Sequence, residues 1–561
     1  MHKNTFNSPL SRRKFLSRTV AVTSGVLLSP LALDACSSDS TKQTYIDVAD
    51  VSHLSSQQQL LFSALQGIAN KTGPNIYLLG LDGSEPGANV TESLWLKEIV
   101  PLEPNFLSIE ALLQKYIRLV DGLILWDSRL AIHTQNLATT LAGVYNYLPV
   151  SAQLANWNLL SKFNLKVKID LSKRNFKNGI AAYTWLLNRK QSNQIQILGP
   201  PVWIGSILNT STPRTSLRDW IVSESGFAFE LYVETLSDLI FLPKLLSFFP
   251  NNSTVYGYLY YDDAVYRKTG IAFNEYTAVS TLSKSNKALV ASSNATNLSV
   301  YSKINSPYIK PKWVNSKTPV SDNTTFISFG FTDGDNVGYN LQHLRKYLWD
   351  DPLRGSFPMS FSISPYLVKL APGAYSYYTR SMTENENLIM GPSGAGYVYP
   401  SDLKNLSQYL KTTKSLMDLT GLDAIWILDN NTIYPPSSSM LDAYVSELNP
   451  TAIVSLYGGF PNAAAYQPAA FLYKGIPILN SVRGIGVNAT TEAILTTNQL
   501  ELNNFRNGLK FQFVALDAWS MTYNDAQSIM KNLGESYKAV TLSTMSKLMA
   551  TYNLKDLSKK H

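Results

Sequence analysis

The sequence predicts an α/β protein with a C-terminal (β/α)8-like barrel of the TIM type, preceded by one or two small α/β domains. Two observations support this fold class. Between residues 316 and 561, eight short apolar segments alternate with helical patterns, and both the alternation and the length suit such a barrel. Between residues 44 and 315, a looser alternation of strand-like and helix-like segments indicates open sheets. A seven-stranded or irregular barrel stays open as an alternative.

Each element follows from its apolar spacing and its flanking turn residues. The predicted barrel strands are 325–331, 359–363, 387–390, 424–428, 452–456, 477–482, 511–516 and 539–542, with helical patterns between most of them, such as 402–419, 439–448, 491–504 and 525–533. In the N-terminal region the predicted segments are strands 45–51 and 75–81 around a helix at 55–70, a βα rhythm through 122–126, 166–171, 179–188 and 195–198, a helix at 235–249 and strands 255–261 and 288–292. A polar, proline-containing connector at 306–321 separates the two regions.

The first 43 residues have the pattern of an export signal and a tether. Arg12 and Arg13 belong to a twin-arginine signal that an apolar run at 20–33 follows, and Cys36 comes after a small residue, as at a bacterial lipoprotein processing site. We expect residues 1–36 to act as the signal and residues 37–43 as the tether. The mature protein is then exported and held to a membrane of the bacterial cell envelope by a lipid on Cys36.

Composition narrows the classes of partner. The first 36 residues carry five basic residues and one acid, so the remaining chain keeps only half of the formal net charge of +8. Without a dense Lys/Arg run outside the leader, we do not expect nucleic-acid binding. Cys36 is the only cysteine, so an exported chain of this kind relies on buried cores rather than on disulfides.

The heptamer Gly-Ala-Gly-Tyr-Val-Tyr-Pro follows the third predicted barrel strand. Gly394 and Gly396 permit positive φ or close approach of a ligand, and Pro400 fixes the exit toward the next helix. Tyr397 and Tyr399 would present flat amphipathic surfaces that suit a sugar ring. An ordinary turn with two half-buried tyrosines would give the same pattern.

Acidic residues follow three of the predicted barrel strands. Asp333 and Asp335 end the first strand, Asp429 ends the fourth and Asp517 ends the seventh. Because active sites of such barrels lie at the carboxyl ends of the strands, these carboxyl groups are candidates for one site. Aspartates at strand ends also serve as turn and cap residues, so each one alone has a structural explanation.

The chain resembles the GxGYxYP family, which is grouped with the glycoside hydrolases. The heptamer itself carries the resemblance, together with the segments Asp333-Gly334-Asp335-Asn336 and Gly391-Pro392-Ser393-Gly394. The resemblance implies a carbohydrate substrate and an α/β region before the barrel.

Glycoside hydrolysis needs one carboxylic acid and one carboxylate from separate positions around the site. We expect Asp333 or Asp335 to supply one group and Asp429 or Asp517 to supply the other, with Glu384 in reserve. The expected substrate-binding residues are Asn336, Asn430 and Arg483 for sugar hydroxyls and Tyr397, Tyr399 and Trp519 for stacking.

Two other functions stay open from the sequence. A noncatalytic glycan-binding lipoprotein would need only the aromatic and Asp/Asn rim, and a metal-assisted hydrolase would hold a divalent cation between Asp333 and Asp335. We otherwise expect no cofactor. An EF-hand is ruled out because Val337 and Leu344 stand where that loop needs oxygen ligands. Paired-His zinc motifs and a G-x-S-x-G serine motif are missing from the sequence.

Overall fold

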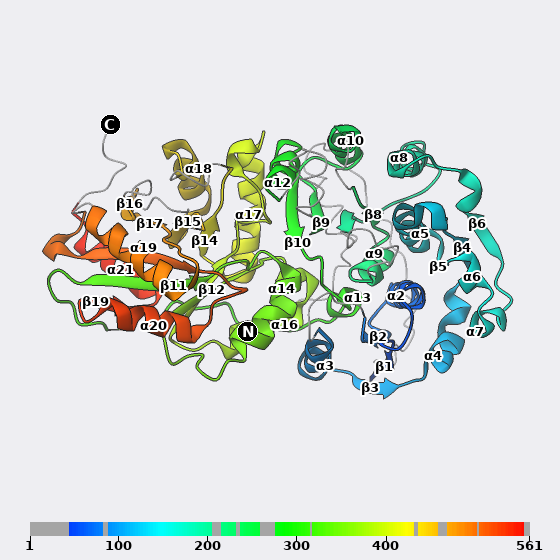
Figure 1. The fold of residues 1–561 in the computed structure, drawn as a ribbon, viewed down its shortest axis with the longest axis horizontal. Helices are drawn as coiled ribbons and strands as arrows, with labels where there is room; N and C mark the ends of the chain where they lie inside the picture. Colours follow the sequence, from blue (N-terminus) through cyan, green and yellow to red (C-terminus); the bar gives the residue numbers. More distant parts are fainter. Residues whose placement is uncertain are drawn as a thin grey trace, which may run out of the picture.

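The computed structural model describes residues 44–81, 88–204, 215–231, 236–258, 275–314, 317–430, 436–457, 468–501 and 504–554. The predicted signal, Cys36 and the tether lie outside this part of the chain. Figure 1 shows the barrel at one end of the long axis, two small sheets at the other end, and the sheet containing β9 and β10 between them. In the described part of the chain, none of the helices has the length and apolar character that crossing a membrane requires.

The C-terminal sheet is a nearly closed barrel of parallel strands, which confirms the predicted fold class. Its seven parallel strands, in spatial order, are β11 (Thr325–Phe331), β12 (Met359–Ile363), β13 (Glu386–Met390), β14 (Ala424–Ile427), β15 (Ala452–Ser455), β17 (Ile476–Asn480) and β18 (Lys510–Leu516). The last strand, β18, pairs with the first, β11, along its whole length. An isolated bridge between Val482 and Val514 joins β17 to β18 and completes the ring.

Two further strands make the barrel irregular. β19 (Tyr537–Ala539) pairs with the first residues of β11, whereas β12 pairs only with the last two residues of that strand. β16 (Ala470–Tyr473) runs antiparallel to β17. The eighth strand was predicted at 539–542, but β19 ends at Ala539. Thr541 instead caps α21 (Leu542–Tyr552) by accepting a hydrogen bond from the Thr544 N–H.

Helices surround the barrel and shield its apolar strands from water. They are α14 (Val337–Leu341), α15 (Leu367–Leu370), α16 (Pro372–Ser381), α17 (Leu406–Thr420), α18 (Ser438–Leu448), α19 (Gly486–Leu500), α20 (Tyr523–Leu533) and α21, and a π-helical segment, η4 (Leu344–Trp349), follows α14. Local sequence sets their ends: Asn405 and Ser437 cap the starts of α17 and α18, and Gly421 ends α17 with φ of 80°. Every residue of β11 is buried, as expected for a strand covered on both faces.

The N-terminal region contains three separate parallel sheets. Their strand orders are β2–β1–β3, β5–β4–β6 and β10–β9–β7–β8. The strands are β1 (Tyr45–Asp50), β2 (Ile76–Leu79), β3 (Glu103–Phe106), β4 (Gly122–Leu125), β5 (Tyr147–Val150), β6 (Val167–Asp170), β7 (Pro201–Ile204), β8 (Phe227–Phe229), β9 (Thr254–Tyr258) and β10 (Ala288–Ala291). The predicted segment 195–198 contains no strand, since the chain enters the sheet only at β7.

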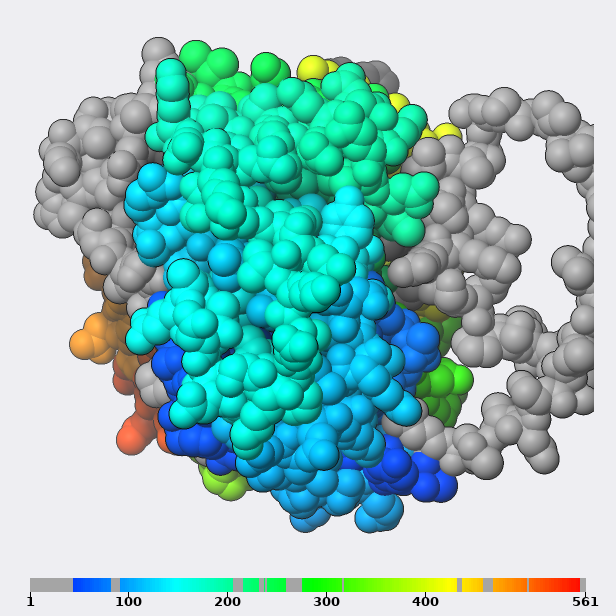
Figure 2. Space-filling model, turned by 90° about the vertical axis from the view of Figure 1, so that its right-hand side faces the viewer, coloured from blue at the N-terminus to red at the C-terminus, as the bar shows by residue number. Residues whose placement is uncertain are grey.

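Helices cover these small sheets. The longer ones are α2 (Ser56–Ala69), α3 (Ala88–Ile99), α4 (Ile109–Tyr116), α5 (Ala131–Tyr145), α8 (Gly179–Gln191), α9 (Arg218–Glu224), α10 (Leu236–Leu246) and α12 (Glu275–Lys284). Ser55 and Gln58 form a capping box at the start of α2, which agrees with the predicted helix at 55–70. Figure 2 shows this end of the molecule, where residues of the first two sheets and their helices fill the visible face.

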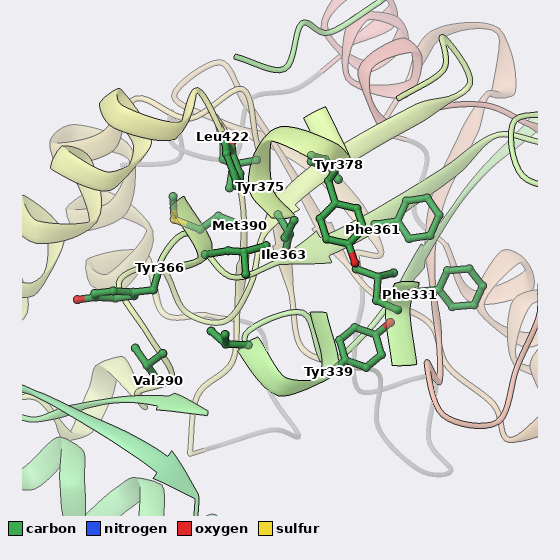
Figure 3. Close-up of a cluster of buried hydrophobic side chains, with 14 of the residues drawn as sticks. Val290, Phe331, Tyr339, Phe361, Ile363, Tyr366, Tyr375, Tyr378, Met390 and Leu422 are labelled. Atoms are coloured by element: carbon green, nitrogen blue, oxygen red, sulfur yellow. The ribbon is translucent and has the colours of Figure 1, made fainter. Parts of the chain in front are cut away.

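The sheet of β9 and β10 packs directly against the barrel. The backbone of Leu289 in β10 pairs antiparallel with Tyr397 of the heptamer, at N···O distances of 3.0 and 2.6 Å. Gln342, just after α14, donates to the carbonyl oxygen of Asn294 beyond β10. Figure 3 shows one buried apolar cluster that includes Val290 and the side chains of the barrel. The edge strand β10 of this sheet therefore lies against the barrel, next to the segments that follow the barrel strands.

Candidate functional site

The turn after β11 is held in one conformation by neighbouring strands. Asp333 has φ of 66°, and its N–H donates to the Tyr457 hydroxyl, 3.0 Å away at the end of β15. The Gly334 N–H donates to the Ser362 Oγ at 2.8 Å. A side chain on Gly334 would meet the Ser362 carbonyl carbon at 1.9 Å, so only glycine fits here. The two aspartates are thus fixed relative to β12 and β15.

Asp335 is a buried carboxyl group. Its exposed fraction is 9%, and within the described ranges no other residue donates a hydrogen bond to its carboxyl oxygens. Gly391 packs so closely that a Cβ there would lie 2.6 Å from the Asp335 nitrogen. Burial raises the pKa of Asp335 well above its usual value, and the charges of Asp333 and Glu275 raise it further. Asp335 is therefore protonated more readily than an ordinary aspartate.

Asp333 sits between several charges. Burial raises its pKa to about 6, and the charges of Glu275 and Asp517 act in the same direction. A hydrogen bond from the Thr332 hydroxyl and the charge of Arg483 act against this rise. The environments of Asp333 and Asp335 thus push both pKa values upward, as acid/base sites require.

Asp517 and Arg483 form an ion pair at the ends of β18 and β17. The Arg483 Nη2 atom contacts the Asp517 Oδ2 atom, while Asp517 Oδ1 accepts from the Ser520 hydroxyl at 2.8 Å and the Trp519 N–H at 3.2 Å. Both charges reach Asp333 electrostatically. The structure therefore brings Asp333, Asp335, Asp517 and Arg483 of the predicted residues to one place.

Two residues of the N-terminal region complete this group, and the sequence analysis missed both. Tyr258 ends β9 and hydrogen-bonds to Glu275, the first residue of α12. Glu275 is exposed, and its charge raises the pKa of Asp333 and of Asp335. The only sequence signal that could have pointed to them is their position after a strand of a parallel sheet, where ligand-binding residues collect.

Asp429 and Asn430, at the carboxyl end of β14, bond to the turn after the heptamer. Asp429 accepts hydrogen bonds from the N–H of Ser401, at 3.1 Å, and from its hydroxyl, and the Asn430 amide donates to Asp402 at 2.9 Å. In the ranges that the structure describes, no hydrogen bond or ion pair joins Asp429 to Asp333, Asp335 or Asp517. These two residues fix the turn that follows the heptamer.

Glu384 lies away from the acidic group, and the Asn336 side chain is used as a helix cap. Glu384 is exposed and precedes β13, so it lies at the amino edge of the barrel, opposite the acidic group. Asn336 caps α14 by accepting a hydrogen bond from the Tyr339 N–H at 3.1 Å.

The heptamer tyrosines are buried rather than open to a ligand. Tyr397 and Tyr399 have exposed fractions of 7% and 3%, and their hydroxyl oxygens lie 3.3 Å apart. Their rings pack in an apolar cluster with the β7–β10 sheet. The antiparallel pairing with Leu289 turns them away from solvent. Trp519, by contrast, is 41% exposed beside Asp517.

The part of the chain that the structure describes contains no set of three or more His, Cys, Asp or Glu residues arranged to hold a metal ion.

These observations define the class of protein: an α/β protein with several sheets and with carboxyl groups at the carboxyl edge of a barrel. The chain belongs to the GxGYxYP family. Residues 323–550 match the "GxGYxYP putative glycoside hydrolase C-terminal domain", residues 206–303 match the "GxGYxYP third domain", and residues 120–193 match the "GxGYxYP_N second domain".

A solved structure has the same fold. It is described as a "putative hydrolase from Bacteroides thetaiotaomicron VPI-5482", and it is similar to this chain with a TM-score of 0.72 and 22% sequence identity over 91% of this chain and 96% of the other. The search of curated proteins found no match.

Proposed function

We propose that this protein is an exported glycoside hydrolase that cleaves a poly- or oligosaccharide with carboxyl groups of the barrel. One observation carries the proposal: Asp335 and Asp333 have raised pKa values beside Asp517, which is ion-paired with Arg483. Carboxyl groups in unlike environments supply the acid and the carboxylate that cleavage of a glycosidic bond needs.

The roles follow from the surroundings of each group. Asp335 is the general acid, because its buried carboxyl keeps a proton that it can give to the leaving oxygen. Asp517 is the carboxylate partner, acting on the sugar or on water, and Arg483 orients it. Asp333 lies close enough to Asp335 for its charge to raise the pKa of Asp335.

Activity screening on aryl glycosides and polysaccharides tests these roles. Asp335→Asn and Asp517→Asn should each lower kcat by at least about 100-fold, the size of a lost general acid or base. Glu384→Gln is the matched control, since this carboxyl group is exposed at the opposite edge of the barrel, and it should keep wild-type rates.

Other outcomes separate the remaining candidates. Glycan binding without any hydrolysis by the wild-type protein would instead identify a noncatalytic glycan-binding protein. Loss of activity in chelator, with recovery on adding a divalent cation, would identify a metal-assisted hydrolase using Asp333 and Asp335. Wild-type rates in both Asn variants would refute the assigned roles.

The proposal also includes export and a lipid anchor at Cys36. Its support is the twin-arginine pattern and the processing-site pattern in the sequence. Cys36→Ser should move the protein from the membrane fraction to the soluble extracytoplasmic fraction. Equal membrane recovery of both forms would contradict the anchor.

A further inference from the structure

A cluster of aromatic rings lies beside the proposed carboxylate. Tyr339 lies in α14, His343 lies between α14 and η4, and Tyr347 lies in η4, and ring contacts of 5.7 Å between Tyr339 and His343 and 4.7 Å between His343 and Tyr347 put the three rings on one side of this segment. Trp519, from the turn after β18, joins them. The ring centroids of His343 and Trp519 lie 4.7 Å apart, as do those of His343 and Tyr347, and Tyr339 lies 5.2 Å from Trp519.

The cluster has one buried ring and two exposed rings. Tyr339 is 2% exposed, whereas Trp519 and Tyr347 are 41% and 45% exposed. The buried Tyr339 ring contacts Trp519 directly and His343, which in turn contacts Tyr347. Large aromatic rings exposed at about two-fifths of their area on a supported base are a feature of ligand-binding surfaces rather than of cores.

This surface is continuous with the acidic group. The Trp519 N–H donates to Asp517 Oδ1 at 3.2 Å, and the His343 ring donates to the backbone carbonyl of Ala518. The charge of Asp517 also reaches His343. The aromatic surface and the Asp517 carboxylate are thus supplied by one turn, residues 517–519.

The charges at the two ends of the surface restrict the occupant. Near Trp519, among the residues that the structure describes, the acidic group contains the carboxyl groups of Asp333, Asp335, Asp517 and Glu275 and the cation Arg483. Asp335 keeps its proton and Arg483 offsets Asp517, so the charge of Glu275, with that of Asp333 above its pKa of about 6, would repel a carboxylate or sulfate group on the ligand. At the far end, the Lys346 ammonium lies 4.8 Å from the centre of the Tyr347 ring, so Trp519 is the main open platform.

We propose that Trp519, His343 and Tyr347 form a binding subsite for an uncharged sugar ring next to the bond that Asp335 and Asp517 cleave. The proposal rests on the proposed function. The C–H face of a sugar ring packs on an aromatic ring through apolar contact, while its hydroxyls stay hydrated at the edges. The subsite fixes the chain on one side of the cleavage point and favours neutral over anionic glycans.

The test uses the full chain with oligosaccharides and with single-sugar substrates. Binding of neutral hexasaccharides (cello-, xylo-, manno- and chito-oligosaccharides) and of an oligogalacturonate is measured by calorimetry on the Asp335→Asn protein, with and without Trp519→Ala. Hydrolysis of single-sugar aryl glycosides is measured on the protein with Asp335 intact. Trp519→Ala should weaken binding of the best neutral hexasaccharide about tenfold, whereas Trp519→Phe should restore most of it because a flat ring remains.

Phe106→Ala is the matched control. Phe106 is an aromatic side chain of β3 with an exposed fraction of 66%, in one of the two small sheets at the opposite end of the molecule from the barrel. It should bind and hydrolyse as the parent does. Thermal melting of each variant shows whether the fold is kept, and Trp519 is exposed enough that its removal should leave the fold intact.

Each result decides between two conclusions. Unchanged hexasaccharide binding in Trp519→Ala, with aryl glycoside hydrolysis still dependent on Asp335, overturns the subsite and leaves the proposed function standing. Tighter binding of oligogalacturonate than of every neutral glycan overturns the uncharged occupant. A wild-type protein that neither binds nor hydrolyses any of these saccharides overturns the subsite and the proposed function together.

Discussion

At the scale of single residues, the buried carboxyl groups of the proposed site lower the stability of the folded protein when they ionise. Asp333 has its folded pKa raised to about 6 from the ordinary 3.8, mainly by burial. A carboxyl group with a raised pKa holds its proton more tightly in the folded chain than in the unfolded chain. Its ionisation therefore lowers the free energy of unfolding as pH rises from about 4 to about 6, and the cost is fully present above that range.

Asp333→Asn should consequently stabilise the protein at pH 8 and leave it unchanged near pH 4. The asparagine keeps an acceptor for the Thr332 hydroxyl and tolerates the positive φ, but it carries no charge to bury. The gain at pH 8 is at most about 3 kcal/mol, from a shift of about two pKa units. Thermal unfolding at the two pH values measures it.

The exposed Glu384→Gln variant is the reference for this measurement and should show no such pH dependence. A destabilised Asp333→Asn protein at pH 8 would show that the Asp333 charge is favourable in the folded state, against the raised pKa.

The site residues that could be predicted from the sequence are those that directly follow a parallel strand of the barrel. Asp333, Asp335, Asp517 and Arg483 all follow parallel strands of one sheet, so they gather at one edge. Asp429 obeys the same rule, yet its oxygens are taken by Ser401. Competition from a nearby backbone N–H and hydroxyl depends on the conformation of the next turn, which strand periodicity does not specify.

At the scale of elements, the apolar runs predicted the positions of most barrel strands closely. Features that depend on pairing between distant segments could not be predicted in this way. β11 and β12 have the predicted bounds because continuous apolar segments between polar turns leave little choice. The heptamer illustrates the opposite case. Its tyrosines were predicted at an open rim, but the backbone of Tyr397 pairs with Leu289, more than a hundred residues earlier, and this partner buries the rings.

Gly396→Ala should weaken this pairing between the barrel and the β7–β10 sheet. The Cβ would lie 2.8 Å from the Leu289 carbonyl oxygen, at a residue with φ of 95°, so both a clash and a strained backbone oppose it. The expected cost is about 2 kcal/mol or more. Amide hydrogen exchange in β10 should speed up before exchange in the barrel strands does.

Gly475→Ala separates the clash from the strain. Gly475 has φ of 80° and no atom within 4 Å of its added Cβ, so it should cost only the backbone term of about 1 kcal/mol. Equal losses in the two variants would mean that contact with Leu289 contributes nothing.

At the scale of the whole molecule, the site belongs to two regions of the chain. The barrel supplies Asp333, Asp335 and Asp517, and the β7–β10 sheet supplies Tyr258 and Glu275 from its own carboxyl edge. Side chains from two parallel sheets therefore meet in one acidic group that neither sheet has alone. This arrangement also explains why reading the barrel sequence by itself could not find Glu275.

Glu275→Gln should shift the pH dependence of hydrolysis without unfolding the protein. The Glu275 charge raises the pKa of Asp335, the proposed acid, so removing that charge lowers this pKa and moves the alkaline limb of the pH–kcat/KM profile to lower pH. Glu384→Gln removes one charge at the opposite edge and should leave the limb in place. Tyr258→Phe removes the hydrogen bond to Glu275 but keeps its charge, so it should change the profile less. A limb that stays fixed in Glu275→Gln would mean that the N-terminal region does not tune the acid, and the site would then belong to the barrel alone.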